Sequence, residues 1–162
     1  MNFGGAASAF SQIPIDWLII AVFFITVTVD AVRAGSVRAC AFALSLPVSF
    51  FLFQLIPQTI VLGPLTAAFQ SPIEKAVIFL ILEVVLFVCV HQMLFSYDRY
   101  SSVFSAVVAG LSATVVVLVI WIQIPALQSL WHFDGQVQTI FGGSYSFLWL
   151  IASYLGLAFI GS

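Results

Sequence analysis

The sequence predicts an all-α integral membrane helical bundle with four transmembrane helices and, as an open alternative, a fifth apolar helix at the C-terminus. Apolar residues make up 63% of the chain and charged residues only 6%, too few to cover a water-facing surface. The apolar residues form runs of helical, membrane-crossing length, separated by short polar stretches. These observations exclude a soluble globular domain and indicate a single membrane domain over residues 1–162.

The first two apolar runs predict a helical hairpin over residues 13–56. The first run, Trp17–Val29, follows Asp16, a carboxyl group that suits the positive end of a helix dipole. The second run covers residues 39–56 and contains Pro47, which predicts a kink because proline cannot donate the helical hydrogen bond. A short polar link between the runs is expected to form the turn of the hairpin.

The next two runs predict a second hairpin over residues 72–124. Its first helix begins at Ser71-Pro72-Ile73-Glu74, the arrangement of a capping box with proline at the first helical position. Its second helix covers residues 103–124 and is closed by Pro125. Between the hairpins, residues 57–70 contain two prolines and a glycine and indicate an irregular connection.

The C-terminal part, residues 125–162, predicts an interfacial stretch followed by an apolar segment. The interfacial stretch contains Trp131, His132 and Asp134, which suit the boundary between lipid and water. The apolar segment, residues 147–160, is short for a transmembrane helix, so whether it crosses the membrane stays open.

Basic residues gather in the two predicted hairpin turns. The first turn holds Asp30, Arg33 and Arg38, and the second holds Asp98 and Arg99. Four spans place both turns on one side of the membrane, and the excess of arginine predicts that this side is cytoplasmic. We expect the two turns to lie together as a polar docking surface.

Glu83 lies near the middle of the third span, where an ionised carboxylate is costly. One interpretation is a neutral carboxyl group that is hydrogen-bonded within the bundle, for instance to Thr26, Thr28 or Thr114. The alternative is a proton or ligand role, with His91 near the end of the same span as a second polar candidate. Both interpretations stay open at the level of sequence.

Small residues recur every four positions in the fourth span, at Ser102, Ala106 and Gly110. This spacing places them on one face of a helix, where another helix backbone can approach closely. We interpret the stripe as a helix-packing surface, while a channel lining is the alternative.

The sequence gives no support for catalysis, so we assign no catalytic residue, no metal ligand and no cofactor. No metalloprotease, nucleophile-elbow, P-loop or dinucleotide-binding pattern occurs. Four Lys or Arg residues against six Asp or Glu residues make nucleic acid an improbable partner. Cys40 and Cys89 suit small apolar positions.

At its two turns the sequence resembles the colicin V production (CvpA) family of small bacterial inner-membrane proteins. The first turn, Arg33-Ala-Gly35-Ser-Val-Arg38, is similar to the family's Arg-x-Gly-aromatic-x-Arg turn, although Ser36 replaces a bulky residue. Asp98-Arg99 before the fourth helix is similar to the family's second motif, in which small residues follow at four-residue spacing. In this chain Ser102 and Ala106 stand where the family has glycine.

The resemblance covers approximately residues 15–124 and implies a multi-pass protein of the bacterial inner membrane. It implies a part in colicin V production or export and in envelope homeostasis, with no catalytic residue to carry over. We therefore expect a protein that acts by assembly with itself or with another membrane protein in the lipid bilayer. The alternative is a small proton-coupled transporter or channel subunit that uses Glu83.

Overall fold

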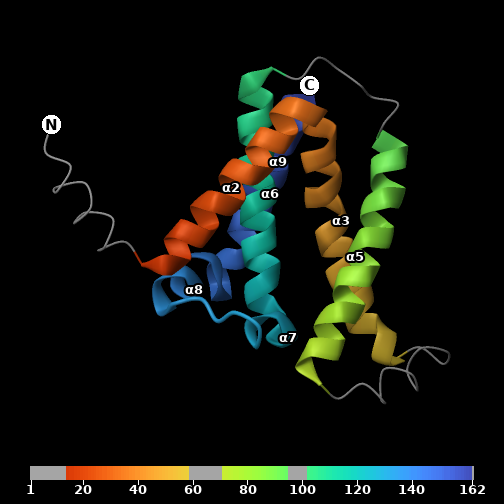
Figure 1. Ribbon diagram of the computed structural model, residues 1–162, viewed down its shortest axis with the longest axis vertical. Coiled ribbons are helices and arrows are strands. Elements are labelled where there is room, and N and C mark those ends of the chain that lie inside the picture. The colour runs from red at the N-terminus through yellow and green to blue at the C-terminus, as the bar shows by residue number, and fades with distance from the viewer. Residues whose placement is uncertain (1–13, 59–70, 95–101, 162) are drawn as a thin grey trace, which may run out of the picture.

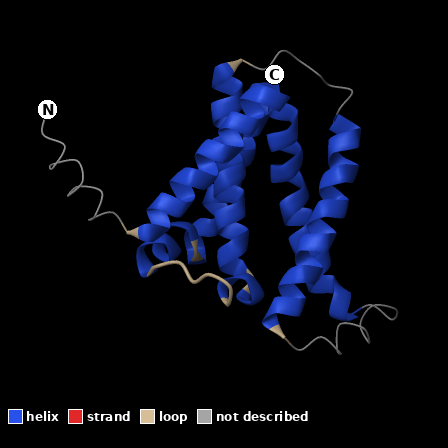
Figure 2. Ribbon diagram, in the orientation of Figure 1, coloured by secondary structure: helices blue, strands red, loops and turns tan. Residues whose placement is uncertain are grey.

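The computed structural model describes residues 14–58, 71–94 and 102–161, and all regular structure there is helical (Figure 2). The four long helices predicted from the sequence are present, together with the apolar C-terminal helix. In order, the elements are α2 (Ile15–Ala34), α3 (Ser36–Leu55), the 3₁₀ turn η1 (Ile56–Gln58), α5 (Pro72–Leu94), α6 (Val103–Gln123), α7 (Pro125–Gln128), α8 (Gly135–Phe141), the 3₁₀ turn η3 (Gly143–Tyr145) and α9 (Ser146–Gly161).

Helix α6 forms the centre of the bundle. It contacts α2, α3 and α9, while α5 lies on the far side of α3 (Figure 1). Protein buries 67% of the apolar stretch of α6, against 11% of the corresponding stretches of α2 and α5. The outer helices therefore expose most of their apolar surface, which lipid has to cover.

Small side chains explain how neighbours can approach α6 on two sides. A Cβ atom added to Gly110 would lie 2.3 Å from the Thr28 hydroxyl oxygen and 3.1 Å from its Cα atom. On another face, a Cβ atom added to Gly156 of α9 would lie 3.1 Å from the Ser112 hydroxyl oxygen. Packing between backbones, which small residues permit, is a major source of helix association in lipid.

Helix α5 is fixed mainly to α3, so residues 72–124 do not form a simple hairpin of two helices packed on each other. Phe79 of α5 meets Phe53 of α3 edge-on, with ring centres 5.7 Å apart. Near the start of α5, Ala76 and Phe79 also belong to a buried apolar cluster that includes side chains of α6. The capping interaction expected at the start of α5 is present, because Glu74 accepts a hydrogen bond from the Ser71 backbone N–H at 3.1 Å.

The first polar link is much shorter than expected from the sequence. Helix α2 continues to Ala34 and α3 begins at Ser36, so the turn consists of Gly35 alone, with φ +92°. Glycine adopts this backbone conformation without steric cost, and the helices on both sides keep their backbone hydrogen bonds up to it. Asp30 and Arg33 are therefore residues of α2, and Arg38 is a residue of α3.

Five segments of the described chain are long and apolar enough to cross a bilayer, so this is a multi-pass membrane protein. The fifth segment, residues 135–159, comprises α8, the η3 turn and α9. The short helices α7 and α8 lie at the end of the bundle where α2 begins (Figure 1). Helix α9 then packs along α6 toward the opposite end. The apolar C-terminal segment, whose structure the sequence left open, is therefore a helix of the bundle.

Candidate functional site

Glu83 lies halfway along α5 with only 5% of its surface exposed. Its Oε1 atom is 2.6 Å from the Ser45 hydroxyl, and its Oε2 atom accepts a hydrogen bond from the Ser49 hydroxyl at 2.5 Å. The two serines stand four residues apart in α3 and so share one helix face. Both oxygens of an intramembrane carboxyl group are thereby bonded across a single helix interface.

The hydroxyl groups of the two serines can bond Glu83 as a carboxylate or as a neutral carboxyl group. The Ser45 oxygen is also 3.0 Å from the Phe42 carbonyl oxygen, yet a serine hydroxyl has only one hydrogen to donate. If Ser45 donates to Phe42, its contact with Glu83 is a hydrogen bond only when the carboxyl group donates. If Ser45 instead donates to Oε1, as Ser49 does to Oε2, the carboxyl group accepts both hydrogen bonds.

Pro47 stands between the two serines and frees a backbone acceptor that α9 uses. Proline lacks an N–H, so the carbonyl of Ala43, four residues earlier, loses its helical donor. The Tyr154 hydroxyl of α9 donates to this carbonyl oxygen at 3.1 Å. One stretch of α3 thus bonds to α5 through serine hydroxyls and to α9 through a backbone carbonyl.

A pocket of about 340 Å³ lies among α2, α3 and α5 near the end of the bundle that holds Arg38. Its lining combines the charged Asp30 and Arg38 with apolar side chains, among them Phe42 and Phe87. These two rings meet edge-on, 6.2 Å apart, and stand one helical turn from Ser45 and Glu83 respectively. The aromatic pair therefore forms part of the pocket wall, while Glu83 is not among the lining residues.

Asp16 is a second carboxyl group with 5% exposure, at the start of α2. Its Oδ1 atom accepts from the Trp131 indole N–H at 3.2 Å, and its Oδ2 atom accepts from the Asp134 backbone N–H at 2.5 Å. The residue was expected near the helix start because of the dipole. The structure adds a tertiary role, since Asp16 fastens α2 to the loop between α7 and α8.

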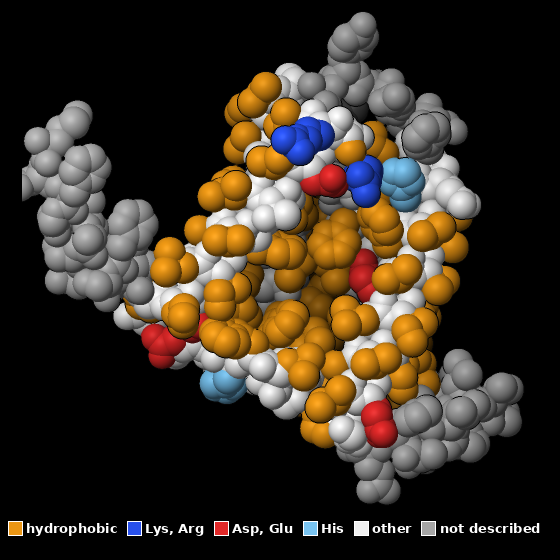
Figure 3. Space-filling view, viewed as in Figure 1, with side chains coloured by type: hydrophobic (Ala, Val, Ile, Leu, Met, Phe, Trp, Pro, Cys, Tyr) orange, Lys and Arg blue, Asp and Glu red, His pale blue; other side chains and the backbone are white. Residues whose placement is uncertain are grey.

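The first predicted polar cluster lies at the other end of the bundle, where basic side chains gather in the space-filling view (Figure 3). Arg38 forms an ion pair with Asp30 at 3.3 Å, across the α2–α3 turn. Both side chains are about half exposed, so the pair is worth about 1 kcal/mol or less. Arg33 is exposed nearby, whereas Asp98 and Arg99 lie outside the described residues, as does any pairing between the two turns.

The predicted packing stripe divides into two roles. Ala106 and Gly110 are buried, and Gly110 faces Thr28 of α2. Ser102 is instead exposed at the start of α6, where its hydroxyl accepts a hydrogen bond from the Ser105 backbone N–H. Ser102 is therefore an N-cap rather than a packing residue, because it precedes the first helical turn.

The partners suggested for Glu83 from sequence were wrong. Thr26 bonds to the Val22 carbonyl and Thr114 to the Gly110 carbonyl, each within its own helix, and Thr28 faces Gly110. The serines at Ser45 and Ser49 were missed, although two hydroxyls at four-residue spacing in another span were a usable signal. His91 packs on Phe87, with ring centres 5.7 Å apart.

No known protein family, curated protein or solved structure matches this chain.

Proposed function

We propose that this chain is a non-catalytic protein of the bacterial inner membrane that acts by assembling with itself or with another membrane protein. Its resemblance to the colicin V production family supports a part in envelope homeostasis or in colicin V production and export. The observation that carries the proposal is the position of α5. This helix is attached to the bundle mainly through α3 and leaves a long apolar face uncovered.

The outer face of α5 is apolar from Ile73 to Val88. Its exposed side chains are spaced three to four residues apart, as on one side of a helix: Ile73, Val77, Leu80, Ile81, Val84 and Val88. Glu83 points the other way, into α3, so this face carries no charged side chain from the middle of the span. It can pack against a second helix without burying a charge.

A cysteine at Val84 gives a direct test of this assembly, because Val84 is exposed in the middle of this outer face of α5. We expect Val84→Cys, in a chain whose native Cys40 and Cys89 are replaced by serine, to form a disulfide-linked dimer or a single mixed adduct of constant mass when native membranes are treated with a membrane-permeant oxidant. The matched control is Ile25→Cys with both native cysteines replaced, because Ile25 is exposed on α2. Monomer alone at native expression, or equal crosslinking from both positions, would contradict the proposal.

The proposed orientation places the end with Arg33 and Arg38 in the cytoplasm. Ala34 is exposed at this end, and His132 is exposed at the other. In a chain without its native cysteines, Ala34→Cys should be protected from an impermeant thiol reagent in intact cells, whereas His132→Cys should react. The reverse pattern would overturn the orientation.

A second candidate function is that of a proton-coupled transporter or channel subunit that uses Glu83. The specific observation in its favour is the mixed pocket whose wall includes Phe42 and Phe87, one turn from the carboxyl group. Intramembrane carboxyl groups are common in proton pathways. Proton flux through reconstituted protein that persists unchanged in Glu83→Gln would remove this candidate, while flux that disappears would support it over pure assembly.

A further inference from the structure

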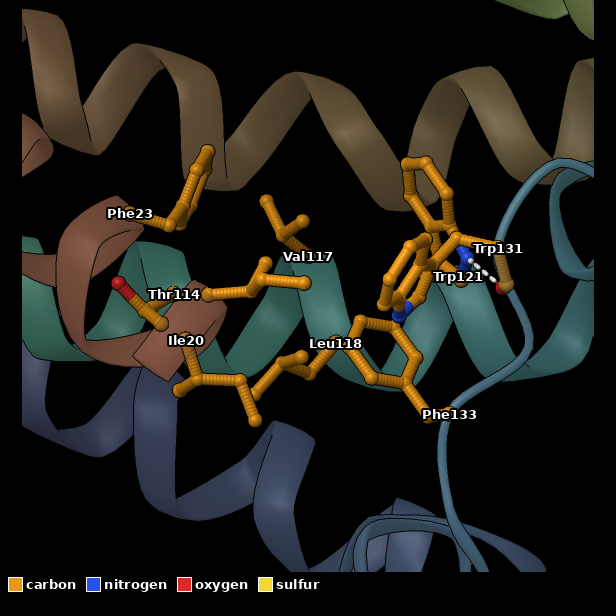
Figure 4. Close-up of a pocket in the computed structure, with 9 residues that line it drawn as sticks. Ile20, Phe23, Thr114, Val117, Leu118, Trp121, Trp131 and Phe133 are labelled. Atoms are coloured by element: carbon orange, nitrogen blue, oxygen red, sulfur yellow. Dashed lines mark hydrogen bonds between the residues drawn. The ribbon is translucent and has the colours of Figure 1, made fainter. Parts of the chain in front are cut away.

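An apolar groove lies where α2 diverges from α6, on the hollow face seen in Figure 3. Its volume is about 260 Å³. Ile20 and Phe23 of α2 form one side, Val117 of α6 forms the floor, and Trp131 closes one end (Figure 4). The helices separate here because they cross at Gly110, about one to three turns away along α6.

The polar atoms around the groove are already bonded within the protein. The Trp121 indole N–H donates to the Trp131 carbonyl oxygen at 3.0 Å, as Figure 4 shows. The Trp131 indole N–H donates to Asp16, and the Thr114 hydroxyl donates to the Gly110 carbonyl oxygen. The groove therefore offers only apolar surface to a bound molecule. A water molecule there would lack the two to four hydrogen-bond partners that it needs.

The shape of the groove limits what can occupy it. From Thr114 to Trp121 the lining extends along α6 for seven residues, or about 10 Å. A helix with its side chains is about 10–12 Å across and cannot enter a groove of this volume. A single hydrocarbon chain is narrow enough, and its preferred direction in a bilayer is along the helices.

We propose that this groove binds one acyl chain of a phospholipid, which enters from the lipid between α2 and α6 and has its headgroup end beside Trp131. The tryptophans and Asp16 lie at the start of α2 and the end of α6, the level at which aromatic side chains meet the lipid interface. The chain fills the wedge between α2 and α6 down to Thr114. This site is independent of the assembly proposed above, because none of its lining residues belongs to α5.

Quenching of tryptophan fluorescence by brominated phosphatidylcholine tests the site, with protein in nanodiscs of 9,10-dibromostearoyl lipid compared with unbrominated lipid. The variant Trp17→Phe/Trp149→Phe keeps the two groove tryptophans, and Trp121→Phe/Trp131→Phe is the matched control. Lipid outside the groove can quench both pairs. The decisive change is therefore Val117→Phe, which fills the groove.

We expect Val117→Phe to lower the quenching of Trp121 and Trp131 at least twofold and to leave the control pair unchanged. Ile20→Phe fills the same groove from α2 and serves as the second variant if Val117→Phe does not fold. Quenching of the groove pair that neither substitution changes would show that the signal comes from surrounding lipid and would overturn the site. Absence of quenching in the unfilled groove would also overturn it, since protein would then occupy the space.

Discussion

Asp16 and Glu83 are equally buried, each with 5% exposure, yet they hold two different regions of the bundle together. Asp16 fastens the start of α2 to a loop through an indole N–H and a backbone N–H. Glu83 fastens α5 to the middle of α3 through two serine hydroxyls. The partners differ in kind, because an N–H group can only donate, whereas a hydroxyl can donate or accept.

This difference determines whether each carboxylate can be replaced by a neutral carboxyl group or an amide. Asp16 meets two donors and has to offer two acceptors. Glu83 meets groups that can reverse their roles, so a neutral carboxyl or an amide can be accommodated at its position. The comparison also extends to packing, because α2 approaches α6 through Gly110, whereas α5 approaches α3 through aromatic edges.

The largest expected loss of stability concerns the contact between α2 and α6. Gly110→Leu should lower the free energy of unfolding by about 3 kcal/mol or more, because its side chain would collide with the Thr28 backbone. Leu111→Ala, at a neighbouring exposed position, should cost less than about 1 kcal/mol. Thermal unfolding in mild detergent measures both, and equal small losses would mean that α2 can move away from α6 freely.

The next largest expected loss of stability concerns the contact between α3 and α5. Ser45→Ala combined with Ser49→Ala should lower stability by about 2–4 kcal/mol, because the buried Glu83 carboxyl loses both partners. Adding Glu83→Leu to this double variant should restore part of the loss, since no buried polar group then remains unpaired. If Glu83→Leu produces no recovery in the same unfolding assay, the serines act through something other than the carboxyl group.

A pair of matched amides tests the comparison itself. Asp16→Asn should cost about 1–2 kcal/mol, because the amide NH₂ then faces a donor and one hydrogen bond is lost. Glu83→Gln should cost less than about 1 kcal/mol, because one serine can accept from the amide while the other donates. A larger loss for Glu83→Gln than for Asp16→Asn would show that α3 and α5 require the carboxyl group itself.

The smallest expected loss of stability lies near Pro47 of α3. Tyr154→Phe should cost about 1 kcal/mol, because the carbonyl oxygen of Ala43 loses its donor from α9. In Pro47→Ala, a restored backbone N–H can bond this carbonyl, so Tyr154→Phe should then cost little. A double-mutant cycle on thermal stability measures the coupling, and an unchanged cost in both backgrounds would show that the two groups act independently.

The boundaries of the helices show which structural features local sequence can predict. The capping residues predicted the start of α5, and the small residues of α6 predicted its close approach to a neighbour. The link between α2 and α3 was predicted too long, because charged residues near a membrane turn were taken to lie outside the helices. Asp30 and Arg38 can remain helical at the end of the bundle, where their side chains are half exposed.

The sequence alone determined that this protein is a membrane bundle, where its first four long helices lie and where its costly carboxyl group lies. These properties follow from hydropathy and from helix signals within a few residues of one another. The tertiary structure decided which helices are neighbours, that Ser45 and Ser49 bond Glu83, and that Asp16 holds a loop more than a hundred residues away. In lipid every outer face is equally apolar, so hydropathy cannot choose among helix pairings; close packing and the few polar contacts make that choice.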